Sequence, residues 1–425
     1  DLASFSALNT AGTDLITVNV SDAVGSTLAA ADLSTLGGKT AGVVTVQNAV
    51  TITGTSAELV AALVTAETKV IAASANIIFT DAPSLAQFAA IDGATSGTLS
   101  YSSIADTAAN LATDAGLASS AVAYNKPITV TDTGTVQAAD LVSISANTSQ
   151  AVTATSATTI SGSAANLVSV VNDTGITTAA NYNAAITGTA STSQISQIDG
   201  DTSGTVSVEN IADTLGNIAS FNTSSATIVQ NASGTVTATG TNNNDSADFS
   251  TVGRSIVIQG LGGNDNLTGT EFGDDITGGT GADSLLGKGG ADVFRFATGD
   301  SPTALVGSLT FDKIGDFDST QDKIDFTSVA PVLGSADLNA SATLGGTTGT
   351  VSVDQFGKIT FSADPVDLAE ALAAVRSIVT GAGEVAFFEF NDGFNGTGTF
   401  LYQDAGVASA TNDMLVLLTG VTGIQ

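Results

Sequence analysis

Four consecutive nine-residue segments between Gly260 and Arg295 constrain the fold of this 425-residue chain more than any other feature. Their sequences are GLGGNDNLT, GTEFGDDIT, GGTGADSLL and GKGGADVFR, so each segment begins with glycine. An aspartate recurs at the sixth place of every segment, and an apolar side chain follows two residues after it; these aspartates are Asp265, Asp274, Asp283 and Asp292. Glycine permits the backbone conformations of tight turns, and the apolar residue fits a short strand whose side chain points inward. The spacing therefore predicts stacked nonads that share a narrow core.

Main-chain carbonyls and one carboxylate per turn would converge at the edges of such a stack. These hard oxygen donors suit Ca²⁺ rather than Zn²⁺ or copper. The segments resemble the RTX family of hemolysin-type calcium-binding nonapeptides, whose consensus is G-G-x-G-x-D-x-U-x. The third nonad matches this consensus at every defined position, and the others depart from it at Leu261, Thr270, Phe272 and Lys288. A glycine- and aspartate-rich linker is the alternative, but flexible linkers do not place aspartates and apolar residues at a fixed spacing.

The resemblance implies a parallel β-roll that binds about two to four Ca²⁺ ions. In the family, carbonyls at the first, third and fifth places of a nonad join aspartates from that turn and from the turn two along. Carried over residue by residue, the four aspartates of the nonads are the predicted carboxylate ligands. The other predicted ligands of the nonads are Gly260, Gly262, Asn264, Gly269, Glu271, Gly273, Gly278, Thr280, Ala282, Gly287, Gly289 and Ala291. Upstream, Asp245 is a further candidate, because Asn242 and Asn244 surround it with oxygen donors in a weaker turn.

The charge pattern and the missing residue types exclude several classes of function. The chain has 41 acidic and 10 basic residues, and residues 240–330 hold 14 of the acidic ones. Nucleic acids and anionic membranes attract positive charge, so neither is an expected partner, whereas the clustering favours cations. The chain contains no His and no Cys, which removes zinc-protease motifs, Ser-His-Asp triads and disulfides. We therefore expect no enzymatic activity, and no apolar run approaches the about 18 residues of a membrane-spanning helix.

Residues 1–238 contain a degenerate repeat. Thr40, Thr95, Thr148 and Thr202 each open a turn-like segment, and the spacing between successive threonines is nearly constant. Every unit contains two short helical phrases, such as residues 31–36 and 57–63, and strand-like pieces lie between them. Short strands that alternate with short helices about every 20 to 30 residues predict a solenoid with a continuous narrow core.

We assign residues 239–300 to the roll and residues 301–425 to a C-terminal β cap that contains one helix. Residues 311–326 resemble the segment that caps the repeats in serralysin-type C-terminal domains. In the RTX family the C-terminal region is recognised by a type I secretion transporter, so the resemblance implies this role for residues 301–425. The helix is expected to be capped by Asp364 and to end near Gly381, and β-hairpins should follow it. Asp318 and Asp325 are expected to be solvated.

Together these features predict a mainly β, secreted structural protein of the cell surface that folds and assembles with copies of itself when it binds Ca²⁺. A surface-layer protein is the favoured class. Two alternatives stay open: the secretion and folding domain of a larger RTX protease or lipase, and an adhesin that binds cell-envelope glycans. Because the chain begins with Asp and not Met, we expect it to be a processed part of a longer protein.

Overall fold

The computed structural model describes most of the chain, and this part is mainly β with parallel sheets and short helices. It covers residues 1–10, 12–67, 70–117, 125–221, 228–230, 234–301, 311–326, 332–333, 338–345, 347–354, 357–381, 383–391, 397–404 and 413–419. The chain divides into two compact units. Unit 1 comprises residues 1–188 and 194–207, and unit 2 comprises residues 189–193 and 208–425. The domain limits at residues 238 and 300 stay predictions, and part of the expected secretion region lies outside the described residues.

Unit 1 is built from successive coils whose strands pair in parallel. Val18 pairs with Val44 and Val44 with Val70, while Ile104 pairs with Ile128. These five side chains are buried, so an apolar row runs from each coil to the next. Two sheets are formed by β1 (Val18–Val20), β3 (Val44–Val46) and β5 (Val70–Ile71), and by β2 (Thr27–Ala29), β4 (Thr51–Gly54), β6 (Asn76–Phe79) and β7 (Leu99–Ser100). Further strands of the unit are β8 (Ile104–Asp106), β9 (Ile128–Val130), β11 (Val152–Ala154) and β13 (Ile176–Thr178) in one sheet, and β10 (Thr135–Gln137), β12 (Thr159–Ser163) and β14 (Asn183–Ala190) in another.

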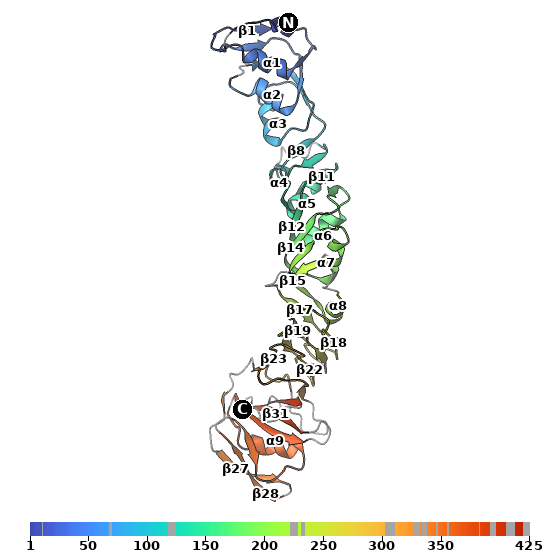
Figure 1. Ribbon diagram of the computed structural model, residues 1–425, viewed down its shortest axis with the longest axis vertical. Helices are drawn as coiled ribbons and strands as arrows, with labels where there is room; N and C mark the ends of the chain where they lie inside the picture. The colour runs from blue at the N-terminus through green and yellow to red at the C-terminus, as the bar shows by residue number, and fades with distance from the viewer. Residues whose placement is uncertain are drawn as a thin grey trace. The chain divides into compact units, whose positions relative to one another are not determined.

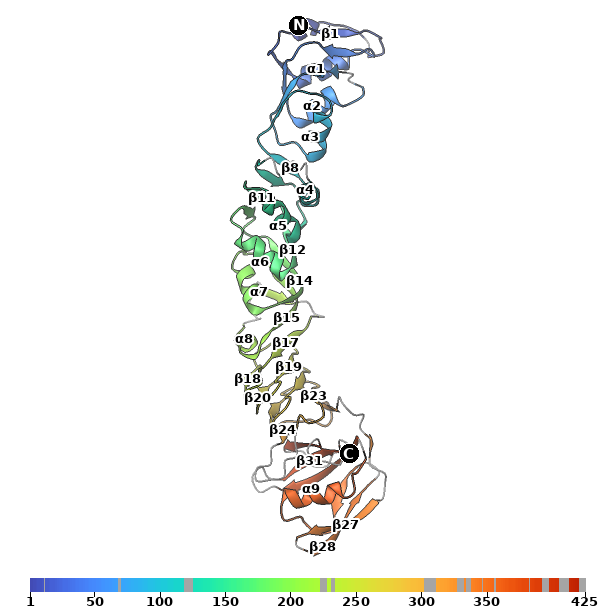
Figure 2. The ribbon, with the colours of Figure 1, turned by 180° about the vertical axis from the view of Figure 1, so that it is seen from behind.

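A short helix recurs in the coils, and α1, α2 and α3 follow one another in both views (Figures 1 and 2). The chain begins with a 3₁₀ turn, η1 (Leu2–Phe5), and the helices are α1 (Ala30–Gly37), α2 (Ser56–Leu63), α3 (Leu85–Asp92), α4 (Ala108–Ala115), α5 (Ala138–Ala146), α6 (Ala164–Asn172), α7 (Thr192–Asp199) and α8 (Leu215–Ser220). The repeat marked by the four threonines therefore corresponds to two helix-bearing coils. Residues 211–218 have the sequence of another helical phrase of the repeat, but residues 211–214 continue strand β15 (Val206–Thr214) and α8 begins only at Leu215.

Carboxylates from one coil cap the helix of the coil before it. The Ser56 amide donates to Asp81 at 2.7 Å, and the Leu85 amide donates to Asp106 at 3.0 Å. The first amides of a helix have no partner within it, and negative charge is favourable at that end. These acidic side chains of unit 1 are therefore satisfied by the protein itself and need no cation.

The recurring Thr-x-Gly turns hold adjacent coils together. The Thr95 hydroxyl donates to the Ala75 carbonyl at 2.7 Å, and the Thr202 hydroxyl donates to the Tyr182 carbonyl at 2.5 Å. Two residues after Thr95, a Cβ on Gly97 would lie 2.0 Å from the Ala75 carbonyl oxygen. Only glycine permits this close approach of the two backbones.

Replacing Gly97 with alanine should lower the free energy of unfolding of unit 1 by about 1 to 3 kcal/mol, because the backbone of one coil must move away from the next. Gly134→Ala is the matched control, since no atom lies within 4 Å of the Cβ it would add. This control should leave stability unchanged or raise it by up to about 1 kcal/mol. Urea unfolding followed by circular dichroism measures both variants, and equal losses would contradict the packing of the coils.

In unit 2, the strands of successive nonads alternate between two parallel sheets. Leu267 pairs with Leu285 in one sheet and Ile276 with Phe294 in the other, so one coil contains two nonads. All four side chains are fully buried, and the predicted narrow core is present. One sheet contains β15, β16 (Ile228–Gln230), β17 (Val236–Thr239), β19 (Val257–Gln259), β21 (Asp275–Thr277), β23 (Val293–Phe296) and β25 (Lys323–Phe326). The other begins with β18 (Ser246–Asp248), β20 (Asn266–Thr268), β22 (Ser284–Leu286) and β24 (Asp312–Ile314). We call residues 236–326 the roll.

The second sheet of the roll continues directly into the C-terminal part of unit 2. Strand β24 pairs in parallel with β32 (Met414–Thr419), which continues antiparallel to β31 (Thr397–Gln403) and β30 (Glu384–Asn391), with β26 (Val332–Leu333) at the edge. A further antiparallel sheet, which the sequence did not predict, contains β27 (Leu338–Leu344), β28 (Thr347–Val353) and β29 (Ile359–Phe361). Helix α9 (Leu368–Arg376) lies beside β27 and β31 (Figure 1). The stacked rings of Phe388 and Phe400, 5.4 Å apart, belong to the core beneath it.

Helix α9 begins later than expected. Its N-cap is Asp367, whose carboxylate accepts the Glu370 amide at 2.8 Å, so Asp364 and Pro365 precede the helix. The Glu370 carboxylate in turn accepts the Val366 amide at 2.6 Å. Asp367 directly precedes the helix, so its carboxylate reaches one of the first free amides, whereas Asp364 lies three residues further away.

Candidate metal centre

The nonad aspartates form two columns, one along each edge of the roll. In the first column, the amides of Asp245, Asp265 and Asp283 each donate to an Oδ1 atom one coil further on, in Asp265, Asp283 and Asp312 respectively, at 2.8, 2.8 and 2.7 Å. In the second column, the amides of Ile256, Asp274 and Asp292 donate in the same way to Asp274, Asp292 and Asp322, at 2.8, 2.7 and 3.0 Å. Each column therefore brings carboxylates of neighbouring coils together through the backbone.

The first column contains unpartnered carboxylate oxygens. The Oδ2 atoms of Asp265, Asp283 and Asp312 are buried and have no hydrogen-bond partner among the described residues, and the three residues are 2%, 2% and 0% exposed. An unpaired charged oxygen out of contact with water costs several kcal/mol unless a cation or a proton balances it. This free-energy cost arises in three consecutive coils, at the same edge of the roll.

The first glycine of each nonad makes room beside these oxygens. A Cβ on Gly260 would lie 2.3 Å from Asp265 Oδ2 and 2.3 Å from the Gly278 carbonyl oxygen. A Cβ on Gly278 would likewise lie 2.2 Å from Asp283 Oδ2. At Gly260 the missing side chain thus leaves a space that is bordered by the Asp265 carboxylate and by a carbonyl oxygen of the next coil, and this donor set fits Ca²⁺.

A Ca²⁺ ion at this edge of the roll would need main-chain carbonyl oxygens among its ligands. Among the residues that the structure describes, no three acidic side chains converge in an arrangement that could hold a metal ion without the backbone. A cation in the first column would therefore depend on main-chain donors as well as on the aspartates.

The second column differs at its first member. Thr270 is fully buried, and its amide and hydroxyl donate to Asp274 Oδ2 at 2.5 Å and to Asp274 Oδ1 at 3.0 Å. Both carboxylate oxygens of Asp322 also have partners, because its Oδ1 accepts the Asp292 amide at 3.0 Å and its Oδ2 accepts the Asp318 amide at 2.8 Å. The protein itself therefore supplies hydrogen-bond donors to both oxygens at the two ends of this column.

The departures from the consensus have different structural consequences. Leu261 and Lys288, at the second place of their nonads, have φ values of 80° and 73°, in the left-handed region where the third nonad has Gly279 at 97°. Such residues cost about 1 to 2 kcal/mol relative to glycine. In the second nonad, Thr270 and Phe272 have no positive φ, so this turn has a different conformation, and the Thr270 amide and hydroxyl bond to Asp274.

The remaining predicted ligands lie along the same two edges. Glu271 is exposed, and its Oε2 lies 3.0 Å from the place of a Cβ on Gly289 in the next coil. The Thr280 carbonyl already accepts the Gly263 amide at 2.9 Å. Buried positions are Gly260, Gly262, Gly269, Gly278 and Gly287, and more exposed ones are Asn264, Gly273, Thr280, Ala282, Gly289 and Ala291. Whether these residues bind metal stays a prediction.

Sequence reasoning did not assign Asp312, Asp316 and Asp322 to the site. Asp312 and Asp322 complete the two columns, and Asp316 accepts the amides of Gly287 and Lys288 at 2.8 and 2.9 Å. The spacing of the nonads does not predict them, because the chain between Asp283 and Asp312 is longer than the two nonads that separate Asp265 from Asp283. The signal was present in the pattern of an aspartate followed two residues later by an apolar residue, which Asp312 and Asp322 share with the nonads.

The two carboxylates expected to be solvated are both only partly exposed. Asp318 is half-buried, and hydrogen bonds from Thr320 and Gln321 lower its pKa. Asp325 instead forms an ion pair with Arg295, which also contacts Asp275 at 2.6 Å. The side chains of Arg295, Asp275 and Asp325 are all partly exposed.

Burial raises the pKa values of the aspartates in both columns. Loss of hydration raises the pKa of Asp283 and of Asp292 from 3.8 to about 7. The pKa of Asp265 and that of Asp274 are also raised by burial, and burial together with the charge of Asp283 places the pKa of Asp312 well above its ordinary value. Deprotonated, metal-free columns are therefore unfavourable in the folded state.

Without calcium, the roll should be more stable at pH 5 than at pH 8. The folded-state pKa values of about 7 exceed the ordinary value of 3.8, so the folded chain binds more protons between these limits, and its stability falls as the pH rises through them. The folded fraction of the roll in EDTA at pH 5, 6, 7 and 8, followed by circular dichroism, measures this trend. A flat profile, or stability that rises with pH, would contradict the burial of these carboxylates.

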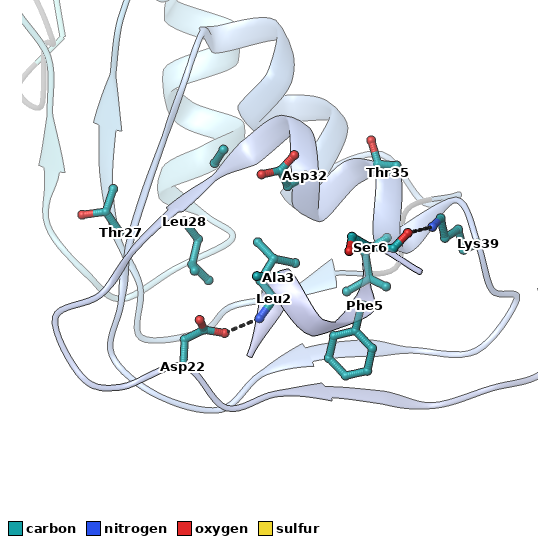
Figure 3. Close-up of a pocket in the computed structure, with 12 residues that line it drawn as sticks. Leu2, Ala3, Phe5, Ser6, Asp22, Thr27, Leu28, Asp32, Thr35 and Lys39 are labelled. Carbon is teal, nitrogen blue, oxygen red and sulfur yellow. Dashed lines mark hydrogen bonds between the residues drawn. The ribbon is translucent and has the colours of Figure 1, made fainter. Parts of the chain in front are cut away.

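A separate hollow of about 430 Å³ lies near the start of unit 1 (Figure 3). Its charged members include Asp22, which accepts the Leu2 amide at 2.7 Å, and Lys39, which donates to the Ser6 carbonyl at 3.1 Å. These groups already have internal partners, so the hollow is a weaker candidate for a binding site than the first column.

In the described part of the chain, no helix has the length and apolar character needed to cross a membrane.

Comparison with known proteins gives limited support. No protein-family model and no curated protein matches the chain. A similar solved structure is the AlgE6R3 subunit from the Azotobacter vinelandii mannuronan C5-epimerase, with 27% sequence identity over 43% of this chain and 73% of that chain. Its TM-score is 0.24, which is too low to establish a shared fold. The functional assignment therefore depends on the geometry of this chain.

Proposed function

We propose that this chain is a calcium-dependent extracellular structural protein whose roll folds when it binds Ca²⁺. One observation carries the proposal: three consecutive coils hold a buried aspartate oxygen without a partner among the described residues, in Asp265, Asp283 and Asp312. In the first two, a glycine borders this oxygen. Nonads of the RTX type, which the sequence resembles, bind the same ion. The proposed cofactor is about two to four Ca²⁺ ions per chain.

Without bound cations, the roll has few interactions that favour folding at neutral pH. Its core has a single buried apolar side chain per nonad, as at Leu267 and Leu285, and it must offset the entropy of ordering glycine-rich turns. Bound Ca²⁺ would supply the positive charge that the aspartates lack. Extracellular modules bind Ca²⁺ with a Kd of about 10⁻⁴ to 10⁻³ M, so the roll would stay unfolded at cytosolic calcium levels and fold after export.

We further propose that the folded protein assembles with copies of itself at the cell surface, as in a surface layer, after export by a type I transporter. The charge distribution supports this, since residues 1–239 contain only three basic residues, Lys39, Lys69 and Lys126, and are rich in Thr, Ser and Ala. The absence of His and Cys from the chain supports a structural rather than an enzymatic role. The proposed localisation is extracellular.

Electron microscopy and light scattering of the purified chain, first in EDTA and then in millimolar Ca²⁺, test both parts. Sheets, tubes or filaments that form only with calcium are the expected result. A chain that folds with calcium but stays monomeric would overturn self-assembly and direct attention to a catalytic or adhesive domain joined to this chain. A chain that calcium leaves unchanged would overturn the calcium-dependent fold itself.

A further inference from the structure

One sheet of unit 1 presents an outer face without charge. This sheet contains β2, β4, β6 and β7, and none of these four strands includes a charged residue. Two rows of outward side chains cross the sheet in register, because the residues between them point into the core. The rows are Ala29, Thr53, Ile78 and Ser100, and Thr27, Thr51 and Asn76. We call these seven residues the strand face.

Ile78 is the large apolar residue of the strand face. It is 42% exposed, whereas Ile77 and Phe79 on either side of it are 0% and 5% exposed. Strand β6 lies between β4 and β7, so Ile78 has an in-register neighbour on each side, Thr53 and Ser100. The strand face therefore has an apolar centre with polar, uncharged side chains around it. In protein–protein interfaces, the residues that contribute most to binding usually lie at such a centre.

The charges of the same coils lie outside the strand face. Asp32 and Glu58 belong to the first turns of α1 and α2, and Asp81 accepts the Ser56 amide at the start of α2. The whole chain has a formal net charge of −31 at pH 7, so two copies repel each other, and like charges brought into contact cost several kcal/mol. Contact between copies is therefore least unfavourable where the surface carries no charge.

We propose that the strand face is a surface on which a second copy of this chain docks, with Ile78 at the centre of the contact. This inference deepens the proposed self-assembly and rests on it. The same face of both copies would meet around a two-fold axis, so uncharged Thr, Ser and Asn side chains would surround the two isoleucines. A face of four short strands is small beside the about 800 Å² per partner of stable complexes, so this contact is weak and one of several that an assembly needs.

The test measures self-association of the full chain in millimolar Ca²⁺, by sedimentation velocity over a range of protein concentrations. The variant Ile78→Lys places a charge at the centre of the strand face. It also makes the net charge less negative, so the general repulsion between copies decreases and association through any other surface would strengthen. In a folded variant, a loss of association must therefore come from the position of the new charge.

Two matched controls receive the same charge elsewhere in unit 1. Val64→Lys changes a residue that is 41% exposed at the C-terminal end of α2, where a positive charge is favourable. Ile71→Lys changes a residue that is 52% exposed in β5, at the edge of the other sheet. Circular dichroism and thermal unfolding establish that each variant is folded. If Ile78→Lys does not fold, Ile78→Thr decides the question, since threonine fills the paired position in β4.

We expect Ile78→Lys to raise the protein concentration at half-association about tenfold or more, because an unpaired charge would be buried in the contact. Ile78→Thr should raise it about fivefold, through the loss of apolar area. Both controls should associate as the wild type does, or at lower concentration.

Wild-type association of the Ile78 variants, or an equal loss in Ile71→Lys, would overturn the assignment to the strand face and leave the proposed function intact. A wild-type chain that is folded in Ca²⁺ but monomeric at every concentration would overturn self-assembly and this surface with it. A monomeric chain whose binding to purified cell-envelope polysaccharide is lost in Ile78→Lys would assign the face to a glycan, which overturns the second copy as its partner.

Discussion

Removal of calcium is expected to unfold the roll and to leave unit 1 folded. At millimolar calcium and a Kd of about 10⁻⁴ M, each bound ion contributes about 1.4 kcal/mol to folding, and the first column alone offers three buried oxygens without a described partner, in Asp265, Asp283 and Asp312. Loss of two or three ions therefore removes about 3 to 4 kcal/mol, while total stabilities of folded domains are about 5 to 15 kcal/mol. Because the roll has a narrow core, this loss should be enough to unfold this part of the chain.

Unit 1 should behave differently because carboxylates at the starts of its helices have partners in the protein; the exception is Asp199, whose buried Oδ1 has no partner among the described residues. Asp81 accepts both the amide and the hydroxyl of Ser56, and Asp132 accepts the Ala108 amide at 2.7 Å. Hydrogen exchange in EDTA and in millimolar Ca²⁺ distinguishes the units, with peptides from β20 to β23 as the test and peptides from α1 and α2 as the internal control. Protection of the roll that is equal in both buffers would contradict this prediction, and loss of protection in both units would show that they unfold together.

The second large effect is expected in the variant Asp283→Asn, which should change the free energy of unfolding in opposite directions without and with calcium. The asparagine keeps an Oδ1 that can accept the Asp265 amide, which now donates to Asp283 at 2.8 Å, but it removes the charge of the unpartnered Oδ2. In EDTA at pH 8, the variant should be more stable than the wild type by about 1 to 3 kcal/mol, because a neutral amide costs less to bury than an unpaired charge. In saturating Ca²⁺ it should be less stable than the wild type, because a ligand charge is missing.

Urea unfolding measures the difference in saturating Ca²⁺, and the folded fraction of the roll, followed by circular dichroism, measures it in EDTA. Ser284→Ala is the matched control, because Ser284 is the next residue and is exposed, and it should change little in either buffer. A variant that is less stable than the wild type in both buffers would mean that Asp283 acts through its hydrogen bonds and not through its charge. A variant that is more stable in both would mean that no cation binds beside it.

The sequence predicted those parts of the fold that depend on local chemistry repeated at a fixed spacing. Apolar residues two places after each nonad aspartate, such as Leu267 and Ile276, form the buried core as expected. Glycines such as Gly260 and Gly278 lie where a side chain would collide with a carboxylate. Short helices with Ser or Thr caps in unit 1 also follow from local signals, as in the capping box of Thr55 and Glu58.

The tertiary structure decided which carboxylates face each other and which of their oxygens are free. Asp312 and Asp322 join the columns although insertions of different length separate them from the nonads, because strand pairing, and not spacing along the chain, aligns one coil with the next. The two columns look alike in sequence, yet Thr270 satisfies Asp274 while Asp265 and Asp283 keep an oxygen without a described partner. Burial, hydrogen bonding and the loss of water depend on atoms from several coils at once, so a nine-residue pattern by itself cannot determine them.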